Sequence, residues 1–172
     1  EIFCSLQGEG PRTGAPCVFI RLAGCNLRCS YCDTRYAFRA RTRLSPADIL
    51  LKIEQYKPVR DVMVTGGEPL LQKKNLLPLL DRLIRKGYST ALETNGSLSL
   101  AGVPPAVMVS MDIKTPSAAG RDTTLSSNLR RLRKKDTVKF VISGRKDYTW
   151  ARKFLKARRP RAGSIFFMAA DR

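Results

Sequence analysis

Apolar residues recur along the chain in short runs, and the segments between these runs have the spacing of amphipathic helices. Six runs have the length and β-rich content of buried strands: residues 18–22, 62–64, 89–92, 106–113, 138–142 and 165–168. Between them, apolar positions three and four residues apart predict helices over about 46–53, 75–86, 125–132 and 148–155. Alternating strands and helices of this kind favour an α/β fold with a parallel sheet and outer helices.

The predicted elements are too few for a complete barrel. Ser45 and Pro46 are typical of a helix start, and Gly87 is typical of a helix end. Six parallel strands fall short of the eight that close a full β/α barrel. We therefore expect an open, partial parallel barrel with outer helices, in one domain over residues 1–172 with a 43% hydrophobic composition.

Unusual polar residues and glycines follow the ends of these strands. Three cysteines follow the first strand, and the tetrapeptide Gly-Gly-Glu-Pro at 66–69 follows the second. Glu-Thr-Asn at 93–95 and Asp-Ile-Lys at 112–114 follow the third and the fourth. Because parallel α/β folds bind ligands at the carboxyl ends of their strands, this edge is the predicted site.

The cysteines favour a metal centre over disulfide bonds. There are five of them, and Cys25, Cys29 and Cys32 fall within eight residues. Cysteines at this spacing indicate a metal site in a reducing cytosol. Histidine is absent, so proton transfer must use carboxylates, lysines, water or a bound cofactor.

The spacing C-x3-C-x2-C predicts an iron–sulfur cluster with an open iron. Three thiolates on one loop can hold three corners of a [4Fe–4S] cluster, which normally takes four cysteines. The fourth iron would then bind a small chelating molecule. A zinc site with Cys4 or Cys17 as fourth ligand is the alternative, although structural zinc commonly uses two C-x2-C pairs.

The charge is strongly positive and unevenly distributed. The net charge is +18, and residues 121–161 hold fifteen Lys and Arg against three Asp, a net of +12. Solvated helix faces explain this pattern, and a nucleic-acid surface is the alternative. No zinc-finger or RNA-binding signature accompanies the charge, so we do not expect nucleic acid as a partner. No apolar run approaches the length of a membrane span and no signal leader opens the chain, so we expect a cytoplasmic protein.

The two glycine- and cysteine-rich motifs together resemble the radical S-adenosylmethionine superfamily. C-x3-C-x2-C after a first strand is its signature, and the tetrapeptide at 66–69 is similar to its second motif. The resemblance implies that S-adenosylmethionine chelates the open iron through its amino and carboxylate groups. It also implies a 5′-deoxyadenosyl radical made on the cofactor, so no side chain is expected as the catalyst.

The flanking residues are similar to a narrower family, the 7-carboxy-7-deazaguanine synthases. The similarity runs through Ser-Leu-Gln-Gly-Glu-Gly at 5–10, Phe-Ile-Arg-Leu-Ala-Gly at 19–24 and Cys-Asp-Thr at 32–34, and continues over nearly the whole chain. It implies a lyase of deazapurine and queuosine biosynthesis. Such a lyase converts 6-carboxy-5,6,7,8-tetrahydropterin to 7-carboxy-7-deazaguanine, with loss of ammonia and with Mg²⁺ assisting.

The family resemblance assigns a role to individual positions. The implied contacts to S-adenosylmethionine come from Tyr31, Cys32, Asp33, Gly67, Asp112, Ile113 and Lys114. The implied substrate contacts come from Leu6, Gln7, Gly8, Glu9, Arg21 and Thr65, and the implied magnesium ligand is Thr34. These residue types suit the tasks, since Gln and Glu match the amide and amino edge of a pterin and Arg can bind a carboxylate through two hydrogen bonds. Glu93 is also expected near the cofactor.

Other expectations follow from the same resemblance. It suggests a homodimer, an anionic electron donor such as flavodoxin, and a C-terminal tail beyond Asp171 and Arg172 that this chain lacks. Two rival functions stay open on sequence alone: an activating protein for glycyl-radical enzymes and a basic zinc-bound nucleic-acid module. The first shares C-x3-C-x2-C but differs in the flanking residues.

Overall fold

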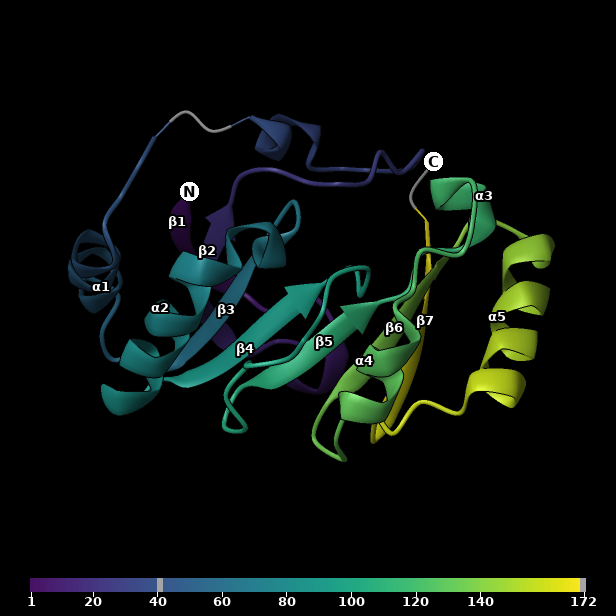
Figure 1. The fold of residues 1–172 in the computed structure, drawn as a ribbon. Helices are drawn as coiled ribbons and strands as arrows, with labels where there is room; N and C mark the ends of the chain where they lie inside the picture. The colour runs from purple at the N-terminus through teal and green to yellow at the C-terminus, as the bar shows by residue number, and fades with distance from the viewer. Residues whose placement is uncertain (40–41, 171–172) are drawn as a thin grey trace.

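The fold is an open, curved sheet of seven strands with helices on its outer face (Figure 1). The structure is a computed structural model and describes residues 1–39 and 42–170, so the chain end at Asp171 and Arg172 lies outside it. The strands are β1 (Ile2–Leu6), β2 (Pro16–Leu22), β3 (Asp61–Gly66), β4 (Ser89–Thr94), β5 (Met108–Asp112), β6 (Thr137–Ile142) and β7 (Ser164–Ala169). The α-helices are α1 (Pro46–Glu54), α2 (Lys73–Arg85), α3 (Pro116–Ala119), α4 (Ser126–Arg131) and α5 (Arg145–Arg158). Three short 3-10 helices are η1 (Gly10–Arg12), η2 (Arg35–Phe38) and η3 (Pro69–Gln72).

The strands lie in the sheet in the order of the sequence. Strands β2 to β7 are parallel, and β1 pairs with β2 in the antiparallel direction. The predicted partial parallel barrel of about six strands is therefore confirmed, with β1 as an additional strand that the sequence analysis missed. β1 is an edge strand whose residues are partly or fully exposed, so it lacks the buried apolar run that identified the others.

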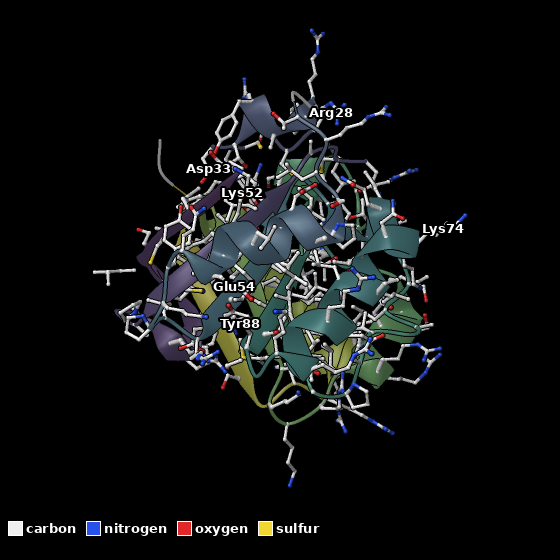
Figure 2. All side chains as sticks on the ribbon, turned by 90° about the vertical axis from the view of Figure 1, so that its left-hand side faces the viewer. Arg28, Asp33, Lys52, Glu54, Lys74 and Tyr88 are labelled. Atoms are coloured by element: carbon white, nitrogen blue, oxygen red, sulfur yellow. The ribbon has the colours of Figure 1, made fainter. Side chains whose placement is uncertain are left out.

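The helix predictions are also confirmed, with shifts of a few residues at their ends. The side-chain oxygen of Ser45 accepts a hydrogen bond from the N–H of Asp48, and the carboxylate of Asp48 accepts one from the N–H of Ser45. This capping box fixes the start of α1 where the sequence placed it. Figure 2 looks onto α1 and α2, where Lys52 and Lys74 lie on the solvent side. In the part of the chain that the structure describes, no helix is both long and apolar enough to cross a membrane.

The two faces of the sheet differ in what they bury. On the outer face, alternate strand residues such as Val18, Ile20 and Leu92 join the leucines of α2 in the main core. On the inner face, Cys17, Met63 and Ala91 form a small second cluster, against which Phe19 and Met108 pack. The inner face is otherwise polar toward the carboxyl ends of the strands, and it is this face that carries the candidate site.

Candidate functional site

The three clustered cysteines lie on the loop that follows β2, at the carboxyl edge of the sheet. All three are free thiols and partly buried. The loop is anchored at both ends, because the N–H of Gly24 donates to Ala37 O at 2.7 Å and the N–H of Ser30 donates to Ala118 O at 3.0 Å. The short helices η2 and α3 thus hold the segment that carries the thiols.

The other two cysteines lie elsewhere in the fold. Cys4 is exposed on β1, and Cys17 is buried near the start of β2. Since β2 separates Cys17 from the loop by the length of a strand, neither thiol is placed to be a fourth ligand. Among the described residues, no three His, Cys, Asp or Glu side chains are gathered as a single ion would require. Three soft thiolates around a larger cluster fit this donor set, with one iron left for another ligand.

The electrostatics around Cys29 connect the loop to β5. Burial raises the pKa of Cys29, and the negative charges of Asp112 and of the two other clustered cysteines raise it further. The Lys114 ammonium lowers the pKa and partly offsets this rise. The ring of Tyr31 lies 5.4 Å from Lys114 Nζ, and burial raises the pKa of Tyr31 to about 12. The cysteine loop and the predicted Asp-Ile-Lys strand end therefore share one electrostatic environment.

The paired glycines bring the end of β3 against the cysteine loop. The N–H of Gly67 donates to Leu22 O at 3.1 Å. A Cβ on Gly66 would collide with the backbone of Leu22, and one on Gly67 would collide with the carbonyl of Gly24 and the side chain of Cys25. Gly66 also has φ +148°, where glycine is favoured. Only two glycines permit this approach, which leaves the backbone at 67 beside the thiols.

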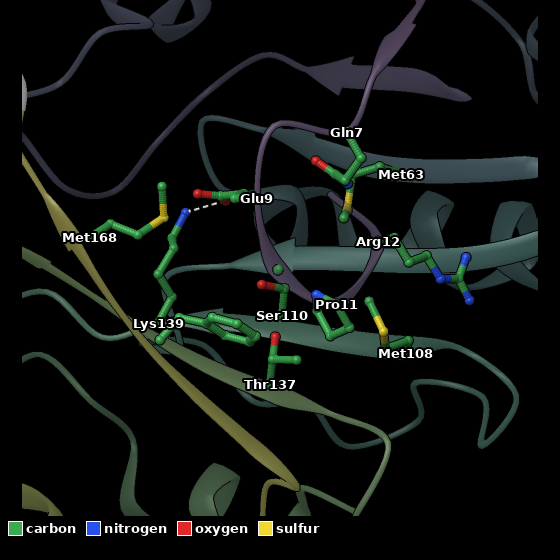
Figure 3. A pocket seen from close by; sticks show the side chains of 12 residues that line it. Gln7, Glu9, Pro11, Arg12, Met63, Met108, Ser110, Thr137, Lys139 and Met168 are labelled. Atoms are coloured by element: carbon green, nitrogen blue, oxygen red, sulfur yellow. Dashed lines mark hydrogen bonds and ion pairs between the residues drawn. The ribbon is translucent and has the colours of Figure 1, made fainter. Parts of the chain in front are cut away.

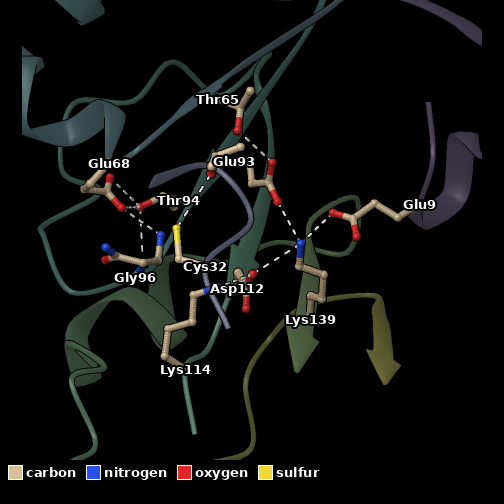
Figure 4. Close-up of polar contacts among 12 residues, drawn as sticks. Glu9, Cys32, Thr65, Glu68, Glu93, Thr94, Gly96, Asp112, Lys114 and Lys139 are labelled. Carbon is tan, nitrogen blue, oxygen red and sulfur yellow. Dashed lines mark hydrogen bonds and ion pairs between the residues drawn. The ribbon is translucent and has the colours of Figure 1, made fainter. Parts of the chain in front are cut away.

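A buried lysine on β6 joins residues from four segments (Figure 4). Lys139 Nζ lies 2.5 Å from Glu9 Oε1, 2.8 Å from Glu93 Oε1 and 3.2 Å from Asp112 Oδ2. Thr65 Oγ1 donates to Glu93 Oε2 at 2.8 Å, which adds β3 to the network. One ammonium thus lies among three carboxylates at the carboxyl edge of the inner face.

These contacts hold most of the network in its charged form. Burial opposes ionisation of Glu93, but the Lys139 ammonium and the Thr65 hydroxyl lower its pKa to about 2. Burial and the nearby Glu93 raise the pKa of Glu9, which Lys139 partly offsets. Burial disfavours the ammonium of Lys139, yet the three carboxylates raise its pKa. The arrangement therefore suits binding and orienting a polar ligand better than passing a proton.

Asp112 and Lys114 extend the network toward the thiols. Lys114 Nζ lies 2.7 Å from Asp112 Oδ2, and Asp112 is 6% exposed. Asp112 Oδ1 is buried and makes no hydrogen bond within the described residues. A buried acceptor of this kind needs a partner, so the atom is available to a ligand donor.

Gln7 and Glu9 approach from the opposite end of the barrel. They lie on the loop between β1 and β2, residues 7–15, which crosses the inner face of the sheet and is named the floor loop below (Figure 3). Met63, Met108 and Met168 line a small hollow together with Gln7, Glu9 and Lys139. The sequence analysis did not predict that two of the expected substrate residues, Gln7 and Glu9, would come from the amino end of the strands.

The remaining predicted substrate positions differ in how they face the site. Arg21 pairs in register with Thr65, so its side chain is on the inner face, where Arg21 Nε donates to Glu1 Oε1 at 2.7 Å. Thr65 is in the Lys139 network. Leu6 is 62% exposed, and Gly8 is exposed beside it.

The predicted cofactor and magnesium positions are spread along the same edge. Thr34 Oγ1 lies 3.9 Å from Cys32 Sγ, and Asp33 between them is exposed. Ile113 is fully buried in the main core, and its N–H donates to Lys139 O at 2.8 Å. Any cofactor contact of Ile113 would therefore use its carbonyl.

Sequence reasoning did not select Lys139 or Glu68. The available signal for Lys139 was a lysine within the otherwise apolar run 138–142, because a buried lysine needs carboxylate partners. Glu68 is 0% exposed and belongs to the glycine-rich tetrapeptide, where only the glycines were considered.

Comparison with known proteins gives one consistent result. The model of the radical SAM superfamily matches residues 19–148. The chain is 41% identical to the 7-carboxy-7-deazaguanine synthase of Koribacter versatilis over 174 residues, which covers 100% of this chain and 77% of that protein. It is 40% identical to the enzyme of the same name from Methanospirillum hungatei, over 96% of this chain and 69% of that protein.

Solved structures agree in fold. The crystal structure of QueE from Escherichia coli matches with a TM-score of 0.81 at 28% identity, over 98% of this chain and 82% of that chain. Streptococcus suis SuiB bound to S-adenosylmethionine matches with a TM-score of 0.68 at 15% identity, over 90% of this chain and 40% of that chain. The second match shows a shared fold alone.

Proposed function

Because the chain belongs to the radical SAM superfamily and, within it, to the 7-carboxy-7-deazaguanine synthases, we propose that it converts 6-carboxy-5,6,7,8-tetrahydropterin to 7-carboxy-7-deazaguanine with loss of ammonia. The observation that carries the proposal is the placement of the cysteine loop, the paired glycines and the Lys139 network at one edge of the inner face. Neither rival function has an observation in its favour.

That placement supports the proposed cofactor residues. Cys25, Cys29 and Cys32 would hold a [4Fe–4S] cluster, and S-adenosylmethionine would occupy the open iron. When bound, the cluster supplies the electron that cleaves S-adenosylmethionine to a 5′-deoxyadenosyl radical. The backbone at Gly67 and the orphaned oxygen of Asp112 support contacts to the cofactor. Tyr31, Cys32, Asp33, Ile113 and Lys114 complete the proposed set.

The substrate would lie between the cofactor and the floor loop. Gln7 and Glu9 line the hollow beside this loop and can form hydrogen bonds with the amide and amino edge of a pterin. Leu6 and Gly8 would contact the ring through their backbone. Arg21, on the inner face beside Thr65, can hold the substrate carboxylate. Glu93 and Lys139 keep these groups oriented and charged.

Magnesium, an electron donor and a second subunit complete the proposal. Thr34 offers a hydroxyl oxygen next to Cys32, and Mg²⁺ prefers such hard ligands together with waters. The net charge of +18 favours an acidic donor protein such as flavodoxin and a negatively charged substrate. The family membership supports a homodimer in a reducing cytosol.

The activity can be tested directly. The protein is loaded with iron and sulfide without oxygen, then mixed with reductant, S-adenosylmethionine, Mg²⁺ and the carboxytetrahydropterin. We expect 7-carboxy-7-deazaguanine by mass spectrometry and no product when any component is left out. A cluster-loaded protein that yields no product would reject the substrate assignment, while the cluster assignment would stand.

The magnesium ligand needs a separate experiment. We expect Thr34→Ala to reduce the stimulation of product formation by Mg²⁺, because the variant lacks the oxygen donor. Thr42→Ala removes a hydroxyl from an exposed residue outside the site and serves as the matched control. A Thr34→Ala protein with an unchanged magnesium titration would show that the ligand lies elsewhere.

A further inference from the structure

Hydrogen bonds hold both sequence neighbours of Cys25, one through its backbone and the other through its side chain. On one side, the N–H of Glu68 donates to Gly24 O at 2.7 Å. On the other, Asn95 Nδ2 donates to Asn26 Oδ1 at 3.1 Å. Each sequence neighbour of Cys25 is therefore tied to a residue that follows a different strand, β3 or β4.

The contact of Asn95 with Asn26 is part of a closed ring. Asn26 Nδ2 donates to Ser97 Oγ at 2.9 Å, and Ser97 Oγ donates to Asn95 Oδ1 at 2.6 Å. Each of the three side chains thus donates to the next one around the ring. The N–H of Ser97 also donates to Asn95 Oδ1 at 3.0 Å, which fixes the amide of Asn95 relative to its own turn. A ring whose members are all satisfied has one preferred orientation.

The buried carboxylate of Glu68 sets the position of this turn. Glu68 Oε2 accepts the N–H of Asn95 at 2.7 Å, and both of its oxygens accept the hydroxyl of Thr94 at 2.8 and 2.9 Å (Figure 4). Glu68 Oε1 also accepts the N–H of Leu70 at 3.0 Å. Two strand ends are therefore joined by one side chain that has no contact with solvent.

We propose that Glu68 and Asn95 are positioning residues for Cys25. Glu68 acts through its own backbone on Gly24 and through Asn95 on Asn26, so the first thiolate is held from both sides. Gly67, the residue before Glu68, packs directly against Cys25. Gly67, whose backbone is offered to the cofactor, and Cys25, the first proposed cluster ligand, therefore move as one unit. The consequence for the cluster rests on the proposed function, whereas the placement of Cys25 does not.

The test measures the three thiols separately in the cluster-free protein. Asn26→Ala, Asn95→Ala and the double variant are alkylated with iodoacetamide, and peptide mass spectrometry gives a rate for each cysteine. We expect Cys25 to react about fivefold faster in each single variant, the scale of one lost hydrogen bond, because its segment opens more often. The double variant should be no faster than the faster single variant, since both changes break the same contact.

The controls lie within the same protein. Cys29 and Cys32 should keep their parental rates, because α3 and not Asn95 anchors their part of the loop. Asn75→Ala, an exposed position on α2, should leave all three rates unchanged. Equal acceleration of all three thiols, or an unchanged Cys25, would overturn the proposal.

A second measurement separates this inference from the function. After anaerobic loading, we expect Asn26→Ala and Asn95→Ala to lose iron to a chelator severalfold faster than Asn75→Ala. If the parent protein takes up no iron, the proposed function fails, and the alkylation rates still decide the role of Asn95. If the parent is loaded and the variants lose iron at the rate of Asn75→Ala, the inference about the cluster fails.

Discussion

At the scale of single residues, the site depends on how its charges are balanced. Lys139 is the ammonium that Glu9, Glu93 and Asp112 share, and its side chain is 10% exposed. Removal of one partner from a buried ion pair costs far more than an exposed pair contributes, because the remaining charges stay desolvated. Lys139 should therefore contribute to stability as well as to binding.

The first prediction concerns this lysine. Lys139→Met keeps the length of the side chain but removes its charge, and should lower the free energy of unfolding by about 3 kcal/mol. Chemical denaturation of the cluster-free protein measures this. Lys52→Met makes the same change on the exposed face of α1 and should stay within about 0.5 kcal/mol of the parent. Equal losses in the two variants would show that the carboxylates do not need Lys139.

The second prediction concerns the pH dependence of stability. The pKa of Glu93 is lowered from 4.5 to about 2 in the folded protein, so its ionised form stabilises the fold. This contribution is complete above about pH 4.5 and is lost as the pH falls toward about 2. The contribution of Glu9 to stability changes with pH in the opposite direction, because its pKa is raised and its protonation relieves a cost of folding.

The measurement compares the parent with Glu93→Gln. We expect the stability of the parent to fall more steeply than that of the variant between about pH 4.5 and pH 3, in urea unfolding of the cluster-free protein. Parallel curves for the two proteins would contradict the lowered pKa.

At the scale of elements, the site forms where strand ends meet without side chains between them. β2 and β3 pair in register up to Leu22 and Gly66, and the next residue, Gly67, lies against Gly24. A side chain at this position would push the cysteine loop away from the sheet. The paired glycines are therefore required for the packing of two elements, apart from any contact to a cofactor.

The third prediction tests that packing. Gly67→Ala should lower the free energy of unfolding by about 2 kcal/mol, as is usual for an overpacked site. Gly8→Ala places the same methyl group where no atom lies within 4 Å, and should leave the stability of the cluster-free protein unchanged. The readout is the denaturation midpoint of each variant. If Gly67→Ala had the same free energy of unfolding as Gly8→Ala, the cysteine loop could shift away from position 67 without cost.

At the scale of the whole molecule, the sequence predicted the parallel part of the fold better than the site. The buried strand segment 62–64 is apolar on both faces, and such a run is recognisable from its composition and length alone. The carboxyl-edge motifs at 66–69 and 112–114 were located correctly, because strand order places them together. Membership of the family confirmed the expected function.

Two features required the structure because they depend on contacts between distant segments. β1 has no buried face in its sequence, and its place is set by pairing with β2. The ion pair of Lys139 with Glu9 joins residues 130 positions apart, and no local pattern contains it. Long-range polar contacts of this kind follow from the curvature of the sheet.

The fourth prediction concerns the floor loop as a whole. Arg12 forms an ion pair with Asp61 at the start of β3, which fixes the loop at the base of the barrel. Arg12→Gln should raise the KM for the carboxytetrahydropterin severalfold while iron content stays at the parental level, because the loop is remote from the cysteines. Arg60→Gln removes a neighbouring exposed charge and is the control. A loss of iron in Arg12→Gln would contradict this separation.

The position of that loop bears on how such a protein could acquire another substrate. The cysteine loop and the paired glycines follow the parallel strands β2 and β3, whereas Gln7 and Glu9, the proposed recognition residues, lie on the loop that joins the antiparallel strand β1 to β2. Strand β1 is joined to the sheet mainly through β2, and the floor loop is joined to it through the ion pairs of Arg12 with Asp61 and of Glu9 with Lys139. A different loop on the same scaffold would present other groups to a ligand at the inner face, while the residues at the carboxyl edge would keep their positions.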